Sequence, residues 1–503
     1  MNTLVEVICD TTARFENKVA FTDITCCYTY KDTYEIACHI AISLIKLHVE
    51  FEPVAIYMER SAKIPGVMAG ILFSSNFYTV LDVDSNEKRL QNIVSILQPK
   101  VIICEKKDEI NCKKIFPNCI ILCFEQAIIT KYDMVAIHSV SQKVISTDPA
   151  FVIFTSGSTG MPKGSIITHK NVISYSKWFV KCFSINHFTN FGSQTPFYFS
   201  ISDLYATWLS GATYHLIPKE YFVFPSLLIQ YLNDKKIDTI YWVPTALKIV
   251  AQFDLLAYEQ VRFLKNVFFA GEVMPIKILN YWKKYYPDMR YVNLFGPTET
   301  TDICAYYIVD KEYSENESLP IGKACEGIRL MILDEKNQLI TDENVKGELY
   351  VIGDFVAKGY YHDIDKTKQS FVLNPFITNY EEIAYKTGDI VMYNDNKELL
   401  YCGRKDYQIK HHGYRIELKE IETAMNSVEG IDICVCLYDQ GKDEIILLYE
   451  GLEEKKEFIQ KMAKNRLNDY MVPSKYIYIQ KLPINSNGKI DRVILKNRYV
   501  TQE

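Results

Sequence analysis

A predicted strand that runs into a glycine-rich loop occupies residues 150–164, which read AFVIFTSGSTGMPKG. The apolar run at residues 150–153 is typical of a buried strand. The glycines that follow let backbone N–H groups converge on an anion, and the hydroxyls add further donors. Lys163 adds a positive charge, but Gly164 follows it where a Walker loop has Ser or Thr. The segment therefore predicts a polyphosphate site other than a P-loop, rather than a flexible surface turn.

The overall charge argues against a dedicated nucleic-acid binder. The 503 residues include 56 Lys and Arg against 62 Asp and Glu, for a net charge of −6, whereas phosphate neutralisation requires a basic excess. Hydrophobic residues make up 48% and charged residues 23% of the chain, which is typical of globular proteins. A prior of about 150 residues per domain favours roughly three domains.

Helical and strand-like stretches alternate along most of the chain. Residues 89–97 and 227–233 are predicted helices, and residues 100–104 and 239–243 are predicted strands. This alternation favours an α/β architecture with largely parallel sheets packed with helices. Residues 347–353 read instead as a strand inside a β-rich subdomain.

The character of the sequence changes after Cys402. Strands are predicted at residues 433–437 and 444–449, and a helix at residues 454–467. We therefore place a domain boundary at residues 403–406. It separates a large N-terminal region, residues 1–402, from a small α+β domain, residues 403–503.

The cysteines and the apolar runs favour a cytoplasmic protein without a membrane anchor. The 14 cysteines are scattered and form no CxxC pair, which suits reduced thiols. The N-terminus lacks the pattern of a secretory signal, and the apolar runs fall short of the roughly 18 residues of a spanning helix. His411-His412 is the only close histidine pair, so no structural metal is predicted.

Five further motifs follow the glycine-rich loop in order. They are NLFGPTET at 293–300, GEL at 347–349 with KGY at 358–360, YKTGD at 385–389, GRKDYQIKHHGYRIELKEIE at 403–422, and NSNGKIDR at 485–492. In these motifs the chain resembles the adenylate-forming enzymes, which include acyl-CoA synthetases, luciferases and the adenylation domains of nonribosomal peptide synthetases. The pattern QIKxHGYR is most similar to that of stand-alone D-alanine–carrier protein ligases.

The resemblance implies a reaction in two steps. A carboxylic acid attacks the α-phosphorus of ATP to give acyl-AMP and pyrophosphate, and the acyl group then passes to the phosphopantetheine thiol of a carrier protein. Thr155, Ser156, Thr159 and Lys163 are expected to hold the β- and γ-phosphates, together with Gly157, Ser158 and Gly160 of the same loop. Thr298 would donate to the α-phosphate, Glu299 would hold Mg²⁺, Phe295 would stack on adenine, Asp389 would bind the ribose, Arg404 would lie near ribose and phosphate, and Asn293 and Gly296 belong to the same nucleotide site.

The resemblance also implies a catalytic lysine and a hinge. Lys489 would bridge the carboxylate and the α-phosphate, and the neighbouring Asn-Gly pair favours a tight turn that presents it. Asp406 corresponds to the hinge about which the small domain rotates, bringing in Lys489 for adenylation or admitting the thiol for transfer.

The sequence departs from the family pattern at the expected acid pocket. Adenylation enzymes for α-amino acids usually carry Phe-Asp-x-Ser, in which the aspartate binds the α-ammonium group. Here residues 197–202 read FYFSIS, so Tyr198 or Ser200 takes the place of the aspartate. The loss of a charge-assisted bond, worth about 1.5–3 kcal/mol, disfavours an ordinary α-amino acid, D-alanine included. A gap in the alignment would bring Asp203 to this position.

The remaining pocket positions form an aromatic wall with Asp302 as the only acid. This lining favours a flat aryl acid such as a hydroxybenzoate, while the amine of a β- or ω-amino acid paired with Asp302 is the alternative. The predicted pocket residues are Phe197, Tyr198, Phe199, Ser200, Ser202, Tyr241, Phe268, Ala270, Gly271, Leu294, Asp302 and Ile303.

Two other functions share these motifs. An acyl-CoA ligase uses the same first half-reaction, and would show a basic groove for the coenzyme A phosphate. A non-catalytic nucleotide-binding relative is the second alternative. Intact Lys163, Glu299, Asp389 and Lys489 argue against that relative.

Overall fold

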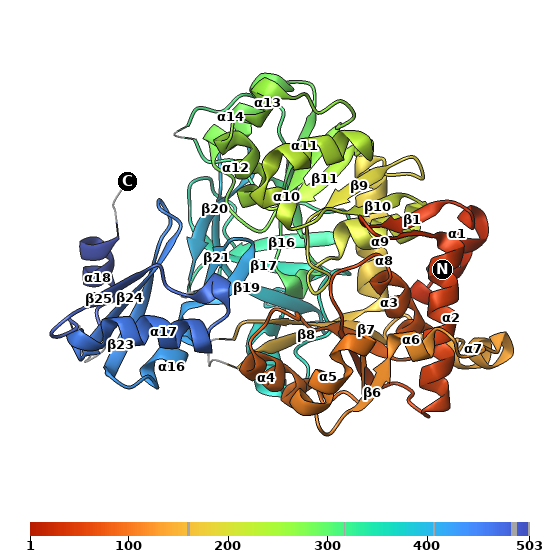
Figure 1. Ribbon diagram of the computed structural model, residues 1–503. Coiled ribbons are helices and arrows are strands. Elements are labelled where there is room, and N and C mark those ends of the chain that lie inside the picture. Colours follow the sequence, from red (N-terminus) through yellow and green to blue (C-terminus); the bar gives the residue numbers. More distant parts are fainter. Residues whose placement is uncertain (158–160, 316, 406–407, 484–489, 501–503) are drawn as a thin grey trace. The chain divides into compact units, whose positions relative to one another are not determined.

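The computed structural model describes residues 1–157, 161–315, 317–405, 408–483 and 490–500 (Figure 1). The chain forms two compact units. The first contains Met1–Val83, Val94–Phe154 and Gly164–Lys405, and the second contains Asp84–Ile93, Thr155–Lys163 and Asp406–Glu503. In the described part of the chain, no helix is both long enough and apolar enough to span a bilayer.

A six-stranded sheet of order β6-β5-β3-β4-β7-β8 carries the glycine-rich loop between its last two strands. The pairs β3–β4, β3–β5, β4–β7 and β5–β6 are parallel. Strands β3 and β5 are buried along their whole length, as expected for parallel strands covered on both faces. The strands are β3 Pro53–Tyr57, β4 Phe77–Val80, β5 Val101–Cys104, β6 Ile120–Cys123, β7 Pro149–Thr155 and β8 Lys163–Thr168.

A nine-stranded sheet of order β15-β14-β13-β12-β11-β9-β10-β1-β2 forms a second layer of the first unit. The six central strands, in the order β13-β12-β11-β9-β10-β1, are parallel to one another. At the two edges, β2, β14 and β15 pair in antiparallel fashion. The strands are β1 Val19–Thr22, β2 Cys27–Thr29, β9 Asn190–Ser193, β10 Thr213–Leu216, β11 Thr239–Trp242, β12 Asn266–Phe269, β13 Arg290–Phe295, β14 Ala305–Ile308 and β15 Lys323–Ala324.

Helix α2 packs against α1 and α3 and against strands β1 and β2. Every residue of α3 is buried, which explains its continuously apolar sequence. The helices are α1 Leu4–Phe15, α2 Tyr30–Lys46, α3 Ile64–Phe73, α4 Glu87–Leu97, η1 Lys106–Asp108, α5 Glu109–Ile115, α6 Phe124–Ala127, α7 Met134–Ser141, α8 His169–Phe183, α9 Ser202–Ser210, α10 Glu220–Val223, α11 Pro225–Asp234, α12 Pro244–Gln252, α13 Leu255–Tyr258, α14 Ile276–Tyr285, η2 Thr298–Thr300 and α15 Ile364–Ser370.

The predicted β-rich subdomain is a five-stranded antiparallel sheet of order β16-β17-β19-β18, with β20 paired to β19. The predicted strand at residues 347–353 is confirmed as β17 Gly347–Gly353. The other strands are β16 Ile328–Leu333, β18 Phe371–Leu373, β19 Ile383–Tyr393 and β20 Leu399–Arg404. The predicted mixed α/β class, with parallel-rich sheets and a β-rich section, is therefore confirmed.

The second unit has its own apolar core, which includes the fully buried Ile416, Met425 and Ile459. A two-stranded hairpin, β21–β22, precedes a three-stranded sheet of order β23-β24-β25. The elements are β21 Gln408–His411, β22 Tyr414–Glu417, α16 Leu418–Asn426, β23 Ile431–Asp439, β24 Glu444–Gly451, η3 Glu453–Lys455, α17 Lys456–Arg466, η4 Asp469–Met471, β25 Lys475–Tyr478 and α18 Arg492–Tyr499.

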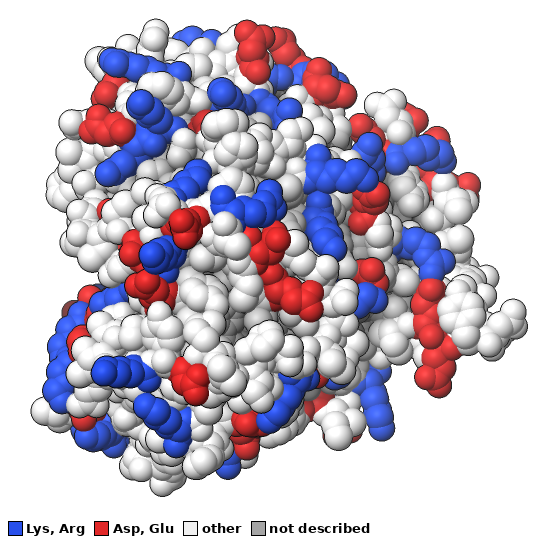
Figure 2. All heavy atoms as spheres, turned by 90° about the vertical axis from the view of Figure 1, so that its right-hand side faces the viewer, with Lys and Arg blue, Asp and Glu red and all other residues white. Residues whose placement is uncertain are grey.

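Acidic and basic side chains are interspersed on the face that Figure 2 shows, rather than gathered into one basic patch. This distribution agrees with the net charge of −6.

Candidate functional site

The glycine-rich loop leaves β7 at Thr155 and enters β8 at Lys163. Thr155 is 1% exposed, and its hydroxyl has no hydrogen-bond partner among the described residues. A Cβ on Gly157 would lie 2.0 Å from the carbonyl oxygen of Met161, so only glycine fits here. Ser158, Thr159 and Gly160 lie outside the described residues. The buried, unpartnered hydroxyl of Thr155 suits a ligand that accepts a hydrogen bond.

Ser156 ties this loop to the β21–β22 hairpin of the second unit. Its hydroxyl donates to the carbonyl oxygen of Arg415 at 2.6 Å and accepts from the backbone N–H of Glu417 at 3.1 Å. The Ser156 hydroxyl therefore already has protein partners, in contrast to the hydroxyl of Thr155.

Glu299 lies in the short helix η2 and is fully buried. The hydroxyl of Tyr360 donates to its carboxylate at 2.7 Å, and its backbone carbonyl accepts from Ala357 at 2.9 Å. Thr298 precedes it and is partly exposed. A buried carboxylate oxygen is the kind of ligand that Mg²⁺ prefers, so this donor fits the expected ion.

Asp389 and Arg404 are cross-strand neighbours on β19 and β20. The guanidinium of Arg404 donates to the carboxylate of Asp389 at 3.0 Å and to the carbonyl of Thr387 at 2.8 Å. The pair is held in one geometry by this charge-assisted bond. The structure therefore brings together the residues expected to bind the ribose.

Several expected nucleotide and acid residues meet at the carboxyl ends of the parallel strands β11, β12 and β13, where α/β sheets bind ligands. The Phe295 ring packs against Tyr401 with centroids 5.7 Å apart. The amide of Asn293 donates to the carbonyl of Pro320 at 2.8 Å. Gly271, directly after Ala270, has a φ of +89°. The buried residues here are Tyr241, Phe268, Ala270, Asn293, Leu294, Phe295 and Ile303.

Asp302 lies just after η2, where the backbone holds two consecutive residues at positive φ, 53° for Thr301 and 85° for Asp302. The Tyr241 hydroxyl donates to its carboxylate at 3.1 Å, and Ser202 at the start of α9 is a second donor. Ser202 also contacts the hydroxyl of Tyr175. Burial raises the pKa of Asp302 to about 6, because the carboxylate has lost most of its water.

Asp302 makes no ion pair with any basic residue in the part of the chain that the structure describes. Gly296 packs closely against the backbone of Asp302, since a Cβ on Gly296 would lie 2.4 Å from the Asp302 carbonyl oxygen. The carboxylate is therefore held by neutral donors, the hydroxyls of Tyr241 and Ser202 and the backbone of Ser202, and a substrate donor or cation would stabilise its charged form.

The FYFSIS segment forms the approach to helix α9. Tyr198 and Phe199 are partly exposed, with ring centroids 4.9 Å apart in an edge-to-face arrangement. Phe197 is buried, and the Ser200 hydroxyl contacts the carboxylate of Asp203 at 3.0 Å. Whether Tyr198 or Ser200 takes the expected aspartate position, that residue carries a hydroxyl rather than a carboxylate.

Sequence reasoning missed Arg60 and Tyr175, and treated Asp203 only as an alignment alternative. Arg60 donates to the carbonyls of Ser193, Thr195 and Ile217 at 2.8, 3.2 and 2.9 Å. Its charge helps to stabilise the fully buried Asp203. No sequence motif marks Arg60 or Tyr175, because an isolated arginine or tyrosine carries no local signal.

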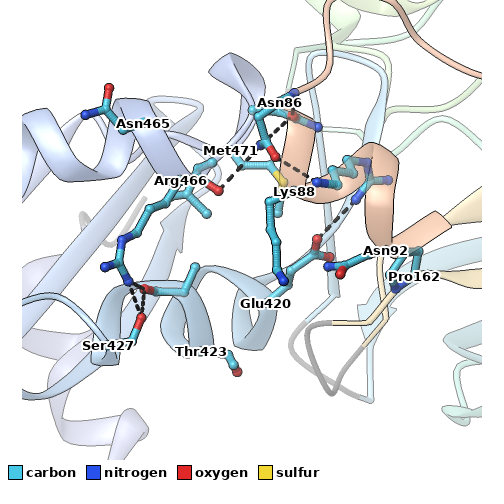
Figure 3. Close-up of a pocket in the computed structure, with 14 residues that line it drawn as sticks. Asn86, Lys88, Asn92, Pro162, Glu420, Thr423, Ser427, Asn465, Arg466 and Met471 are labelled. Atoms are coloured by element: carbon cyan, nitrogen blue, oxygen red, sulfur yellow. Dashed lines mark hydrogen bonds and ion pairs between the residues drawn. The ribbon is translucent and has the colours of Figure 1, made fainter. Parts of the chain in front are cut away.

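The second unit contains a cavity of about 410 Å³ (Figure 3). Arg89 and Glu420 form an ion pair at 3.1 Å on its wall, and Asn86 donates to Asn468 at 2.9 Å. Burial raises the pKa of Glu420 to about 7. Pro162 alone comes from the glycine-rich loop, so this cavity differs from the sites predicted from the motifs.

The fold and these motifs define an adenylate-forming ligase. Residues 9–361 match the family described as AMP-binding enzyme, and the chain belongs to this family.

Among its relatives, the D-alanine--D-alanyl carrier protein ligase of Listeria monocytogenes serotype 4a (strain HCC23) is 32% identical over 464 residues, with 89% of each chain covered. Gramicidin S synthase 1 of Brevibacillus brevis is 30% identical over 87% of this chain and 39% of its own. The Vibrio cholerae adenylation domain AlmE, solved with glycyl-adenosine-5'-phosphate, has a TM-score of 0.82 and 20% identity, over 99% of this chain and 98% of its own.

Proposed function

We propose that this ligase uses ATP and Mg²⁺ to activate a small carboxylic acid as acyl-AMP, releases pyrophosphate, and transfers the acyl group to the phosphopantetheine thiol of a separate carrier protein. The observation that carries the proposal is the 32% identity, over 89% of both chains, with a ligase named for a carrier protein. The same similarity makes an acyl-CoA ligase the weaker alternative. The 30% identity with gramicidin S synthase 1 favours a role in natural-product assembly of the nonribosomal type.

The nucleotide roles follow from the donors that the structure describes. Thr155 supports the phosphate role with a buried hydroxyl that lacks a protein partner. The fully buried Glu299 carboxylate would hold Mg²⁺, which would neutralise phosphate charge. Asp389, fixed by Arg404, would accept from the ribose hydroxyls. The remaining proposed contacts are Ser156, Gly157, Ser158, Thr159, Gly160 and Lys163 for the β- and γ-phosphates, Thr298 for the α-phosphate, Phe295 for adenine, and Asn293 and Gly296 for the shape of the site.

The catalytic step depends on residues outside the described part of the chain. Lys489 would place its ammonium between the carboxylate and the α-phosphate, where charge shifts during attack. Asp406 would be the hinge that lets residues 403–503 move between the two half-reactions. The division of the chain after Lys405 supports this position for the hinge.

The acid would lie with its far end toward Asp302. A hydroxylated aryl acid would stack on the aromatic wall and donate its phenolic hydrogen to the carboxylate. The absence of a basic partner for Asp302 among the described residues favours a second candidate, a β- or ω-amino acid whose ammonium pairs with Asp302. Both candidates agree with a hydroxyl, rather than a carboxylate, at Tyr198 or Ser200.

Acid-dependent ATP–pyrophosphate exchange tests the proposal. The panel would include hydroxybenzoates, β- and ω-amino acids, and D- and L-α-amino acids, with an acid-free control. Exchange with one aryl or amino acid supports the adenylation and identifies the pocket chemistry. Exchange only with D-alanine or another α-amino acid would overturn the substrate class, and no exchange with any acid would contradict the activity.

The acceptor is tested separately with the acid that gives exchange. Radiolabelled acid would be incubated with the enzyme and either a phosphopantetheine-loaded carrier protein, the same carrier without its arm, or free coenzyme A. Label on the loaded carrier alone supports transfer to a carrier protein. Label on coenzyme A at a comparable rate would favour the acyl-CoA ligase.

A further inference from the structure

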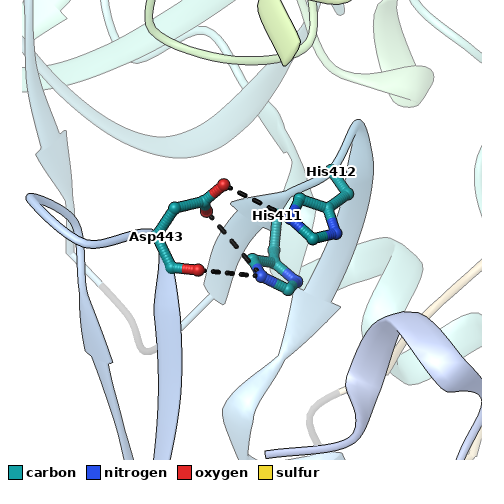
Figure 4. A group of neighbouring side chains, drawn as sticks. All are labelled: His411, His412 and Asp443. Carbon is teal, nitrogen blue, oxygen red and sulfur yellow. Dashed lines mark hydrogen bonds and ion pairs between the residues drawn. The ribbon is translucent and has the colours of Figure 1, made fainter. Parts of the chain in front are cut away.

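Two turns of the second unit bring His411, His412 and Asp443 together (Figure 4). The first turn joins β21 to β22, and His412 and Gly413 occupy it with φ values of 50° and 80°. Positive φ at both positions is what a two-residue type I′ turn requires. The second turn joins β23 to β24 and ends with Asp443 at a φ of 56°. Both turns therefore use uncommon backbone geometry to present these side chains.

One donor atom from each of the three residues lies within 4.8 Å of the other two. His412 Nε2 is 3.4 Å and His411 Nε2 is 3.7 Å from the carboxylate oxygens of Asp443. Ligand atoms that surround a tetrahedral zinc ion at about 2.0–2.1 Å lie roughly 3.3–3.4 Å from one another. The donor spacing therefore matches a metal-binding set with small side-chain adjustments.

The surroundings of His411 also match those of a metal ligand. Its Nδ1 lies 3.0 Å from the carbonyl oxygen of Tyr470, so Nδ1–H can donate there and leave the lone pair on Nε2. A ligating histidine usually donates its other ring N–H to such a carbonyl or carboxylate. The hydroxyl of Tyr438 donates to the Asp443 carboxylate at 2.5 Å, which fixes the third ligand in the same way.

His411 Nε2 faces acceptors as well, because the backbone carbonyl of Asp443 lies 3.2 Å away. A neutral imidazole donates from only one nitrogen, so the second nitrogen would oppose another lone pair. A metal ion between Nε2 and Asp443 would relieve this conflict. His412 packs on His411 with ring centroids 3.9 Å apart, so the two imidazoles are held side by side.

We propose that His411, His412 and Asp443 bind a divalent transition metal of the zinc type. Two imidazoles and one carboxylate suit zinc and its neighbours, whereas calcium and magnesium prefer all-oxygen sites. His411 is 9% exposed, and the His412 side chain is 52% exposed. The metal thus has an entry path, and its fourth position is open to water or to a group from outside. The site is independent of the acid and nucleotide chemistry proposed above.

The experiment measures zinc binding to the purified full-length chain after metal removal, in competition with a chromophoric chelator of micromolar affinity. The test variants are His412→Asn and Asp443→Asn. Asparagine tolerates positive φ, so both variants keep their turns while losing the ligand. The matched control is His48→Asn in the first unit, which replaces an exposed histidine at a φ of 55°. All 14 cysteines remain in every variant, so zinc bound by thiols is common to all.

We expect one zinc ion per chain that the wild type and His48→Asn bind alike. His412→Asn and Asp443→Asn should each lose at least about tenfold in affinity for this ion, since altering even an outer-shell partner usually costs 10–100-fold. Equal zinc affinity in all four proteins would overturn the proposal. So would zinc binding by the wild type that is too weak to compete with the chelator.

A second readout separates ligation from a structural role of the same residues. Co²⁺ in place of zinc should give the intense visible absorption of a tetrahedral site in the wild type and in His48→Asn. Zinc should also raise the melting temperature of these two proteins more than that of the two ligand variants at the same zinc concentration. Absence of the cobalt spectrum in a wild type that binds zinc would place the ion elsewhere, and would contradict the assignment.

Discussion

Asp302 in the first unit and Asp443 in the second both accept a hydrogen bond from a tyrosine hydroxyl, yet their pKa values are shifted in opposite directions. Burial raises the pKa of Asp302 to about 6. The hydrogen bond from His412, with further help from Tyr438 and His411, lowers the pKa of Asp443 to about 2. The difference teaches that hydroxyl donors do not offset the burial of the Asp302 carboxylate, whereas at Asp443, whose side chain is 29% exposed, hydrogen bonds and nearby imidazoles outweigh a smaller cost of burial.

A substitution at neither aspartate gives the largest expected effect and sets the scale for the comparison. Lys489→Ala should lower the rate of acid-dependent pyrophosphate exchange by about 10²–10³, because it removes a preorganised cation from the reacting groups. ATP binding, measured by calorimetry, should persist. Lys481→Ala, an exposed lysine of the same region, is the control, and near-normal exchange in Lys489→Ala would refute the catalytic role.

Asp302→Asn tests whether the poorly stabilised carboxylate serves the substrate. It keeps the shape and the backbone geometry but removes the charge, so kcat/KM for the native acid should fall by about 10–100-fold, as for the loss of a charge-assisted bond. The wild-type kcat/KM should also decline as the pH falls through about 6, where Asp302 takes up a proton. Equal kcat/KM values for Asp302→Asn and for the exposed control Asp288→Asn would exclude Asp302 from acid recognition.

The two aspartates should affect stability with opposite dependence on pH. An aspartate has a pKa of about 3.9 in the unfolded chain. Because the folded Asp302 has a pKa of about 6, it binds more protons in the folded state, and its contribution to stability falls as the pH rises from about 4 to about 6. Asp302→Asn should therefore gain roughly 1–3 kcal/mol over the wild type above pH ~6.

Asp443 should show the reverse in the presence of a metal chelator. Its folded pKa of about 2 lies below the unfolded value, so its contribution is present above pH ~4 and is lost as the pH falls toward ~2. Melting temperatures of the wild type, Asp302→Asn and Asp443→Asn across this range check both signs. Parallel pH profiles for the two variants would contradict the opposite pKa shifts.

The smallest expected effect concerns the approach to the pocket. If Tyr198 occupies the position of the missing aspartate, Tyr198→Asp should reduce kcat/KM for the native acid by about 2–10-fold, as for the loss of a neutral contact. It should also raise exchange with α-amino acids, whose ammonium gains a partner. Tyr198→Phe, which keeps the ring, is the control. Unchanged kinetics in Tyr198→Asp would favour the register that places Ser200 there.

The sequence predicted the elements whose signal is local. The apolar run before Thr155 became β7, and residues 347–353 formed β17 with the expected bounds. The predicted helix at residues 89–97 begins slightly earlier, as α4 Glu87–Leu97. Local hydrophobic pattern and turn chemistry are sufficient for these elements.

Long-range contacts could not be predicted in the same way. Arg60 donates to carbonyls more than 130 residues away in the chain, and the sequence gives an isolated arginine no reason to be buried. The pair His411-His412 was visible, but Asp443 approaches His411 from 32 residues further along. Only the packing of two turns in the folded unit makes a three-residue set of them.

The backbone at Asp302 also limits how this pocket can be re-engineered or diverge. A φ of 85° at that residue, directly after a φ of 53° at Thr301, is tolerated by Asp, Asn and Gly but strains branched side chains. Among substitutions at this codon, a saturation library should therefore return well-folded proteins mainly with asparagine or glycine. Selectivity for a larger or fully apolar acid would have to evolve at residues that contact Asp302, such as Tyr241, rather than at the aspartate itself.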